Sequence, residues 1–411
     1  MSVEGWLQKK VSDLCDLGRG RVISAQEIEL KPGIYPVFSS QSQKRGEMGR
    51  IDTYDFDGEY ITWTTDGAYA GTVFYRTGRF NCTNVCGTLH AKSSQLSMEF
   101  LAYKISTVAK KHVSYVGNPK LMNNVMSNIG LSLPEDPAEQ TQIAAILSTI
   151  DRAIEQTEAI IAKQQRIKTG LMQDLLTKGI DEDGNVRSEE THEFKDSAIG
   201  RIPVEWEIRT LESIVDEPIT YGIVQAGSHV DGGIPYIRTG DMAGDFLELE
   251  RLLRTSKKIA TSYKRSEVSA GDIVFALRAT VGKVLPVSQE LSGSNLTQGT
   301  AKISAAYDIN QTFLLWALRS SIIARQIQLV QKGTTFSEIT LGDLRKLRLI
   351  IPRSKEEQSN IGTQLRDHQD NIQLMKIILA KYKETKEGLM QDLLTGKVRV
   401  TELLKDAEAS P

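Results

Sequence analysis

The 411-residue sequence has few cysteines and no long hydrophobic run. Cys15, Cys82 and Cys86 make an odd number in a long chain, which argues against a disulfide framework and fits a reducing compartment. No apolar run approaches the roughly eighteen residues of a membrane helix, and the Met-Ser-Val-Glu start is unlike a signal peptide. We therefore expect a cytoplasmic globular protein, and the length predicts two or three domains.

Excess positive charge is also absent, since the formal net charge is -2, although binding to nucleic acid normally needs surplus Lys and Arg. The basic residues are clustered, however, at 251–265 and at 104–120. Acidic residues gather between Asp181 and Asp196, which is typical of a solvated connector. Because most basic runs are merely solvated surface, these clusters alone identify no ligand.

Recognisable catalytic motifs are missing as well. Gly282-Lys283 is like part of a phosphate-binding loop, but Leu277 stands where the first glycine belongs. Val284 likewise stands where a magnesium-binding hydroxyl is required. We therefore expect no catalytic residues in this chain.

Metal-binding motifs fail on spacing. Along a strand, Cys82, Cys86 and His90 would span roughly 26 Å at 3.3 Å per residue, too far for one zinc ion. Residues 181–185 lack the later glutamate of a calcium loop, and we interpret them as a turn. We expect no metal site.

An internal repeat organises the chain. The octapeptide Gly-Leu-Met-Gln-Asp-Leu-Leu-Thr occurs at 170–177 and recurs unchanged at 388–395, an offset of 388 - 170 = 218. The same offset aligns further residues without a gap, namely Pro134 with Pro352, Glu139 with Glu357, and Gln140 with Gln358. We interpret this as the duplication of one scaffold.

Each octapeptide lies near the end of a predicted long helix, at 136–178 and 353–396. About forty residues almost free of helix breakers would extend roughly 60 Å at 1.5 Å per residue. Apolar residues follow at steps of four and three, as in a coiled-coil seam. The seam residues are Ile143, Leu147, Ile150, Ile154 and Ile161, then Ile361, Leu365, Ile372, Met375 and Leu379. Thr157, Gln164 and His368 interrupt the seam, and we interpret them as register-fixing or tolerated residues.

Two globular domains, 1–135 and 206–352, precede the helices and resemble each other weakly. Both begin near a tryptophan, Trp6 or Trp206, and both combine short β-rich runs with a helical stretch, around 99–109 and 310–330. Three further correspondences pair 58–61 with 271–274, 71–73 with 282–284, and Asn84 with Asn295. An acidic connector at 179–205 and a tail at 397–411 complete the predicted organisation.

Two similar domains on a duplicated spacer suit a linear ligand with two separated sites. The motifs that identify a family are the repeated octapeptide, the helix starts at 140–154 and 358–372, and Ile-Pro-Val-Glu-Trp at 202–206. With these, the chain resembles the specificity subunits of type I restriction-modification enzymes over nearly its whole length. The resemblance implies an α/β (α+β) fold class, with two target recognition domains separated by two long antiparallel helices in a pseudo-twofold repeat.

The same resemblance implies function and partners. The chain would be a non-catalytic subunit that recognises a bipartite, asymmetric site in double-stranded DNA. Two methyltransferase subunits would carry S-adenosylmethionine, and two restriction/translocase subunits would use ATP and Mg²⁺. No cofactor is expected in this chain itself.

Candidate DNA contacts lie in polar loops. The loop 278–283 follows an expected strand and places two cations and a hydroxyl beside a glycine, which suits phosphate and groove contacts. Its counterpart, 64–69, lacks these cations, so the two loops should read differently. The candidates are Lys44, Arg45, Thr65, Tyr69, Arg238, Thr239, Arg278, Thr280, Lys283, Lys332 and Thr334. Each is also explained as an exposed residue near a turn.

The octapeptides offer candidate partner contacts. A repeated outward face suits two copies of one partner. These candidates are Met172, Gln173, Asp174, Met390, Gln391 and Asp392. The competing interpretation is that the octapeptide leucines simply close the helix pair.

Two alternative functions remain open. One is a coiled-coil scaffold whose domains bind proteins rather than DNA, which salt-dependent binding to duplex DNA would argue against. The other is a nucleic-acid enzyme with an unrecognised site, which absence of methylation or cleavage by the purified chain would argue against.

Overall fold

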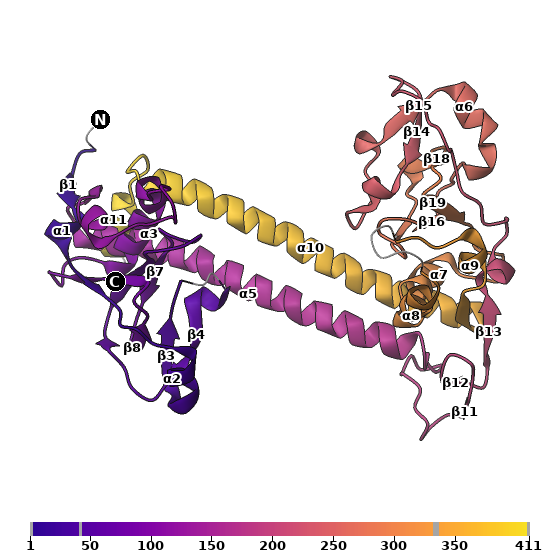
Figure 1. The fold of residues 1–411 in the computed structure, drawn as a ribbon, viewed down its shortest axis with the longest axis horizontal. Helices are drawn as coiled ribbons and strands as arrows, with labels where there is room; N and C mark the ends of the chain where they lie inside the picture. Colours follow the sequence, from indigo (N-terminus) through magenta and orange to yellow (C-terminus); the bar gives the residue numbers. More distant parts are fainter. Residues whose placement is uncertain (1–2, 41–42, 332–336, 409–411) are drawn as a thin grey trace. The chain divides into compact units, whose positions relative to one another are not determined.

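The computed structural model describes residues 3–40, 43–331 and 337–408 (Figure 1). It divides into two compact units, unit 1 with Met1–Glu158 and Ile377–Pro411, and unit 2 with Ala159–Lys376. Each unit thus contains one globular domain and a segment of each long helix. Among the described residues, no helix combines the length and apolar character that crossing a membrane requires.

Unit 1 contains a strand pair, two four-stranded sheets and a capped helix. The strand pair is β1 (Trp6–Lys10) with β10 (Gly130–Pro134), antiparallel, with Trp6 opposite Pro134. The first sheet has the order β2 (Cys15–Arg19), β9 (Cys86–Ala91), β6 (Tyr60–Thr64), β7 (Val73–Arg76), and the second β4 (Glu47–Ile51), β3 (Pro32–Phe38), β8 (Arg79–Cys82), β5 (Phe56–Asp57). The helices are α1 (Val11–Leu14), α2 (Ala25–Leu30), α3 (Met98–Val108), α4 (Asn123–Ser127) and α11 (Thr401–Glu408).

The core of unit 1 packs α3 against the first sheet around the fully buried Trp63. The Trp63 indole N–H donates to the Leu121 carbonyl at 2.9 Å, which satisfies its polar atom inside the core. Gly87 on β9 lies opposite Trp63 on β6, and an added Cβ would lie 2.2 Å from the ring, so only glycine fits. Ser97 caps α3 by accepting the Phe100 N–H at 3.2 Å.

Unit 2 repeats much of this plan. The strand pair is β13 (Trp206–Thr210) with β20 (Arg348–Pro352), with Trp206 opposite Pro352. Its sheets have the orders β17 (Val284–Pro286), β16 (Ile273–Ala276), β19 (Thr300–Ile303), and β15 (Leu253–Thr255), β14 (Ile234–Ile237), β18 (Asn295–Leu296); β11 (Phe194–Lys195) pairs with β12 (Ile202–Pro203). The helices are α6 (Lys257–Ser262), α7 (Gln311–Leu318), α8 (Ser321–Val330) and α9 (Leu341–Arg345).

The sequence correspondences between the two domains mark equivalent strands. In unit 1, β6 pairs antiparallel with both β7 and β9. In unit 2, β16 pairs in the same way with β17 and β19. The predicted class of two α/β domains is therefore confirmed. The helical stretch at 310–330 is two helices rather than one, because Ser320 leaves helical geometry and caps α8 by accepting the Ile323 N–H.

The two long helices are α5 (Pro137–Leu175) and α10 (Lys355–Leu393), each of 39 residues. In unit 1, the start of α5 at Ile143 shares a core with Leu393 at the end of α10. In unit 2, the end of α5 at Leu175 shares a core with Ile361 near the start of α10. Within each unit the helix segments therefore run antiparallel. Two seam interruptions meet in unit 2, where His368 Nε2 lies 3.1 Å from the Gln164 carbonyl oxygen.

A buried glutamine ties the start of each long helix to its domain. Gln140 donates from Nε2 to the Pro134 carbonyl at 2.9 Å, and its Oε1 accepts the Ser97 N–H at 3.1 Å. Gln358 makes the same pair of contacts, to the Pro352 carbonyl at 2.9 Å and from the Asn310 N–H at 2.6 Å. The repeated glutamine thus joins a strand end to the cap of a domain helix in both units.

The neighbouring glutamates anchor segments that follow the octapeptides. In unit 1, Glu139 is paired with Arg399 at 2.6 and 2.7 Å. In unit 2, Glu357 is paired with Arg187 and accepts the Trp206 indole N–H at 3.1 Å. Although the connector's acidic residues are largely exposed, the connector is therefore anchored to unit 2 through Arg187, and the tail to unit 1 through Arg399.

Candidate nucleic-acid interface

The tip of the β6–β7 hairpin in unit 1 holds two of the predicted contacts. Thr65 is completely buried, its hydroxyl donates to Asp66 Oδ2 at 2.6 Å, and it accepts from Arg19 Nη2 at 3.2 Å. Tyr69 is half exposed. Within this loop, Tyr69 is thus available to a ligand, whereas Thr65 supports the turn.

A second loop packs beside this tip. The Asp66 backbone bridges Lys120, and the Gly67 N–H donates to the Pro119 carbonyl at 2.9 Å. This loop exposes Tyr115 and Val116. It is preceded by the exposed Lys110 and Lys111, so this end of unit 1 combines cations with aromatic and apolar side chains.

One lysine of the predicted basic cluster at 104–120, Lys104, does not lie on the surface. Its side chain is buried, and Nζ donates to the Leu394 carbonyl at 2.5 Å beneath the Trp6 ring. Burial lowers the pKa of this lysine. Sequence inspection could not distinguish this internal lysine from its exposed neighbours, because it lies on the α3 face that packs inward.

Lys44 and Arg45 lie in a short 3-10 turn, Gln43–Gly46, away from the β6–β7 tip. The Arg45 carbonyl accepts from Arg76 at 2.7 Å, and its guanidinium lies 3.5 Å from Glu155. Arg76 pairs with Tyr60 at the other end of β6, about 13 Å along the strand from the tip at 3.3 Å per residue. Arg45 and Tyr69 are therefore not neighbours. Only the backbone of Lys44 is described.

In unit 2, three predicted contacts meet around one hollow of about 370 Å³, which Arg238, Thr239 and Arg278 help to line. The side chain of Arg238 is held by Asp241 through bonds of 3.0 and 2.7 Å, and this hydrogen bonding raises its pKa. Arg278 Nε lies 3.0 Å from Glu338. Carboxylates thus orient both guanidinium groups, which remain partly exposed. Gln298 also lines the hollow and was missed from the sequence, because strands distant in sequence bring it there.

Two predicted loops contain unusual backbone. Among the described non-glycine residues, only Arg45 and Ala279 have positive φ, at 53° and 59°. This conformation costs an L-residue on the order of 1 kcal/mol, and such strain clusters at functional sites. Ala279 lies between two candidates, Arg278 and the exposed Thr280.

Lys283, at the end of this loop, belongs to a different surface. It lies 3.9 Å from Asp245 and lines a separate cleft with Trp316. The structure thus separates Lys283 from Arg278, although six residues of sequence contain both. Lys332 and Thr334 fall outside the described residues.

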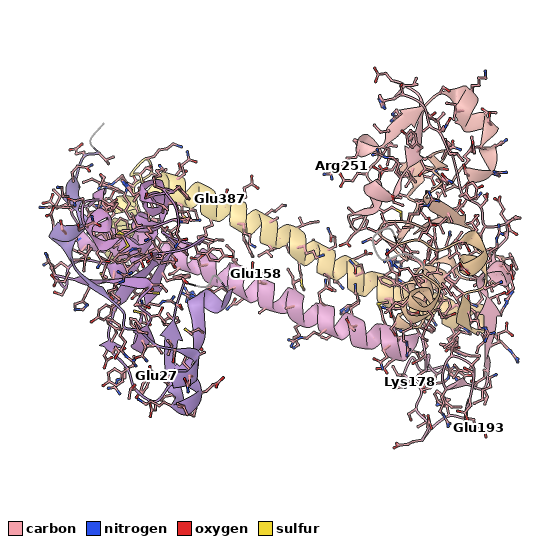
Figure 2. The ribbon with its side chains drawn as sticks, in the orientation of Figure 1. Glu27, Glu158, Lys178, Glu193, Arg251 and Glu387 are labelled. Atoms are coloured by element: carbon pink, nitrogen blue, oxygen red, sulfur yellow. The ribbon has the colours of Figure 1, made fainter. Side chains whose placement is uncertain are left out.

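A basic helix lies beside this hollow's sheet. Exposed cations occupy α6 and the turn after it, namely Lys257, Lys258, Lys264 and Arg265. The buried Asn295 on β18 donates to the Tyr263 carbonyl at 3.1 Å and to Ser266 Oγ at 3.3 Å, which fixes this segment to the sheet. Arg251 (labelled in Figure 2), earlier in the same basic stretch, is exposed and is paired with Glu248 at 2.7 Å.

The two segments whose spacing did not fit a metal site have other structural roles. Cys82 and Cys86 are buried free thiols, and burial raises the pKa of both, that of Cys86 to about 11. Asp181 closes a turn by accepting the Asn185 N–H at 2.8 Å, as predicted. In the described part of the chain, no three His, Cys, Asp or Glu residues are arranged to hold a metal.

The octapeptides divide into buried and exposed residues in the same way in both copies. Four of their six leucines, at 175, 176, 393 and 394, are buried in the unit cores, and Leu171, Met172, Leu389 and Met390 pack against those cores. Lys178 (labelled in Figure 2) pairs with Asp174 at 2.8 Å, and Lys397 pairs with Asp392 at 2.8 Å. Gln173 and Gln391 are exposed.

Comparison with known proteins adds family evidence. A family model described as "Type I restriction modification DNA specificity domain" matches residues 3–164 and 203–384. The "Putative type I specificity subunit S.MpnORF289P N-terminus" of Mycoplasma pneumoniae is 48% identical over 141 residues, which cover 34% of this chain and 75% of that protein. Other M. pneumoniae relatives are matched over only 43 to 60% of their length.

Further matches that extend over nearly the whole chain include a sequence relative and a solved structure. The "Type I restriction enzyme MjaVIII specificity subunit" of Methanocaldococcus jannaschii is 24% identical over 97% of this chain and 94% of its own. The crystal structure of a "Type-I restriction-modification system S subunit" from M. genitalium has a TM-score of 0.67 at 15% identity, covering 96% of this chain and 99% of the other. The structural likeness concerns the fold.

Proposed function

We infer the function of this chain from the premise that it belongs to the type I restriction-modification DNA specificity family. We propose that it recognises a bipartite, asymmetric site in double-stranded DNA, with residues 1–135 contacting one half-site and residues 206–352 the other. It is proposed to be the non-catalytic subunit of its complex. The observation that supports two different half-sites is that equivalent hairpins carry different side chains at their tips.

The proposed contacts in the second domain surround the hollow lined by Arg238, Thr239 and Arg278. Arginine can donate two parallel hydrogen bonds to guanine, and threonine can contact either base edges or phosphate. The carboxylates that hold both arginines reduce their freedom before DNA binds, which favours a specific contact over a diffuse one. The cations of α6 would bind phosphates and fix the register.

The proposed contacts in the first domain are of a different kind. Tyr69 and Tyr115 are exposed, and so are Lys110, Lys111 and Lys120 in the segment that packs at this hairpin tip. Apolar and aromatic groups suit thymine methyls or the sugar backbone, and the lysines suit phosphates. Thr65 would act by supporting the loop, because its hydroxyl is already bonded within the protein.

Partner binding is proposed at the exposed octapeptide faces. Two methyltransferase subunits carrying S-adenosylmethionine would dock there, and two restriction/translocase subunits using ATP and Mg²⁺ would complete the complex. Gln173 and Gln391 are the exposed residues that such docking would use. Replacing both with Glu should reduce co-purification of the methyltransferase subunits while leaving the melting temperature unchanged. Unchanged co-purification would contradict this assignment.

The decisive experiment exchanges one domain. Residues 206–352 are replaced by the equivalent segment of a relative, and methylated sites are mapped across a genome. One half of the site should change and the other half should stay. Change in both halves would refute separable readers. If purified complex showed no salt-dependent affinity for duplex DNA, the domains would instead bind proteins.

A further inference from the structure

A cationic cleft in unit 2 lies apart from the proposed base-reading hollow. Its volume is about 540 Å³, and it is bounded by the ends of α5 and α7, the β16–β17 hairpin and α10. The cations that line it are Lys168, Lys283, Arg319 and Arg366. Its apolar wall includes Met172 and the half-exposed Phe246.

Among the described residues of unit 2, no carboxylate forms a direct ion pair with the two most enclosed cations. Lys168 Nζ donates to the neutral Gln369 Oε1 at 2.7 Å, and Arg319 Nη2 donates to the Val284 carbonyl at 2.9 Å. Both lie over the Trp316 ring, at 5.8 and 4.9 Å from its centroid. Burial, and for Lys168 also the neighbouring Arg319, lowers the pKa of both groups, because their charges are incompletely compensated.

The nearby carboxylates compensate the positive charge of the cleft only in part. Asp245 is shared by Lys376 at 3.3 Å and Lys283 at 3.9 Å. Arg366 pairs with Asp367 at 3.3 Å. Asp370 also lines the cleft, so four lining cations face two lining carboxylates, and a surplus of positive charge remains at its centre.

The equivalent cleft of unit 1 shows what this one lacks. The offset of 218 aligns Lys168 with Lys386 and Gln369 with Asp151. There Lys386 pairs with Asp151 at 2.5 Å, and Tyr103 donates to the same carboxylate at 2.7 Å.

The domain helices show a second exchange. Aligning their caps, Ser97 and Asn310, places Tyr103 opposite Trp316 and Ser106 opposite Arg319. Unit 2 therefore has the neutral Gln369 where unit 1 has a carboxylate, and it has Arg319 where unit 1 has Ser106.

We propose that the unit 2 cleft binds a small phosphate ester, whose phosphate takes the place that Asp151 occupies in unit 1. Convergent lysine and arginine donors favour phosphate, which offers several charged oxygens, over a single carboxylate. The apolar wall of Met172 and Phe246 favours an organic group attached to that phosphate. The proposal does not depend on DNA reading, since Arg238 and Arg278 line another hollow.

The test uses the full chain without DNA at constant ionic strength. Calorimetric titration compares ATP, inorganic pyrophosphate and adenosine. ATP should bind saturably, pyrophosphate more weakly, and adenosine not at all. No saturable binding of ATP, or adenosine binding as tightly as ATP, would overturn the proposal. Equal affinity for pyrophosphate and ATP would overturn the proposal of a phosphate ester, because the cleft would then bind an inorganic anion.

Two variants locate the site. Gln369→Glu supplies the missing carboxylate internally, and ATP affinity should fall about tenfold or more, since a charge-assisted contact is lost to competition. Lys168→Gln should weaken ATP similarly, whereas the matched Lys386→Gln in unit 1 should leave it unchanged. ATP binding that is unaltered in Gln369→Glu, or equally weakened in Lys386→Gln, would refute this cleft as the site.

Discussion

The two units share an arrangement of secondary structure but differ at the tips of their equivalent hairpins, β6–β7 and β16–β17. Each has a strand pair in which a tryptophan lies opposite a proline, an antiparallel hairpin with a third strand, and a domain helix with a side-chain cap. In each unit, a glutamine forms hydrogen bonds with the end of the strand pair and with the helix cap. At the tip, however, unit 1 bridges Asp66 with Lys120, whereas unit 2 bridges Arg278 with Glu338. The signs of the charges are reversed. The buried hydrogen bonds are thus the same in both copies of the duplicated scaffold. The solvent-facing ion pairs differ, because they can change with the ligand.

The largest effect should come from breaking the interior tie of unit 2. Glu357→Ala leaves Arg187, about a tenth exposed, without its carboxylate and Trp206 Nε1 without an acceptor. Removing one partner of a buried pair costs about 3 to 5 kcal/mol. Glu139→Ala in unit 1 should cost less, because Arg399 is 30% exposed and can be hydrated. Urea denaturation of both variants measures the difference.

A matched control separates charge from packing. Glu357→Gln keeps the size and the bond from Trp206, so it should lose less stability than Glu357→Ala. Equal losses for both would show that the bond from Trp206 and the packing of the side chain add nothing to the ion pair with Arg187. A larger loss for Glu139→Ala than for Glu357→Ala would reverse the comparison.

The next effect concerns the reversed tips. Arg278→Ala should weaken binding of the cognate DNA by about 1 to 3 kcal/mol and relax one position of the site. Lys257→Ala on α6 should instead weaken all sequences alike and reduce the salt slope by about one. Titrations at several salt concentrations check both. If Arg278→Ala left affinity and sequence preference intact, the hollow would not be the reading site.

A smaller effect should come from relieving backbone strain at the unit 2 tip. Ala279→Gly removes the Cβ from a residue with φ of 59°, and stability should rise by up to about 1 kcal/mol. The control Ala162→Gly, at an exposed position inside α5, should lower stability by about 1 kcal/mol. Thermal melts of the two variants should shift in opposite directions. A fall for Ala279→Gly would mean that the strain is not released.

The smallest effect is expected for an exposed ion pair in unit 1. Glu158 (Figure 2) lies 2.7 Å from Lys383, and both side chains are about half exposed. Lys383→Ala should change stability by about 0 to 1 kcal/mol, because solvent screens such pairs. Lys386→Ala, whose partner Asp151 is less exposed, should cost more. Equal melting temperatures for these two variants would show that the more exposed and the less exposed ion pair contribute equally to stability.

Much of the arrangement shared by the two units was predictable from residue patterns. The offset of 218 aligns Gln140 with Gln358, and their hydrogen bonds are indeed equivalent. Glycine-bounded runs located β6, β7 and their counterparts, because tight turns need glycine at fixed places. The break at Ser320 was missed, since Ser inside an apolar run does not by itself end a helix.

The candidate site was less predictable, because its members come from distant strands. Arg238 and Arg278 lie 278 - 238 = 40 residues apart in sequence yet line one hollow, while Lys283, five residues from Arg278, faces another. Side-chain direction at a hairpin tip depends on local φ, which Ala279 sets in an unexpected way. Burial of Thr65 and Lys104 likewise depends on partners that local sequence does not reveal.

The division of the chain into units has a consequence for synthesis on the ribosome. Unit 2 is one uninterrupted stretch, whereas unit 1 needs Leu393, Arg399 and Val400 to complete its core and to neutralise Glu139. The first domain therefore emerges early but waits for more than two hundred residues of later chain. Unit 2 can finish folding in the meantime, so the order of completion should be the reverse of the order of translation.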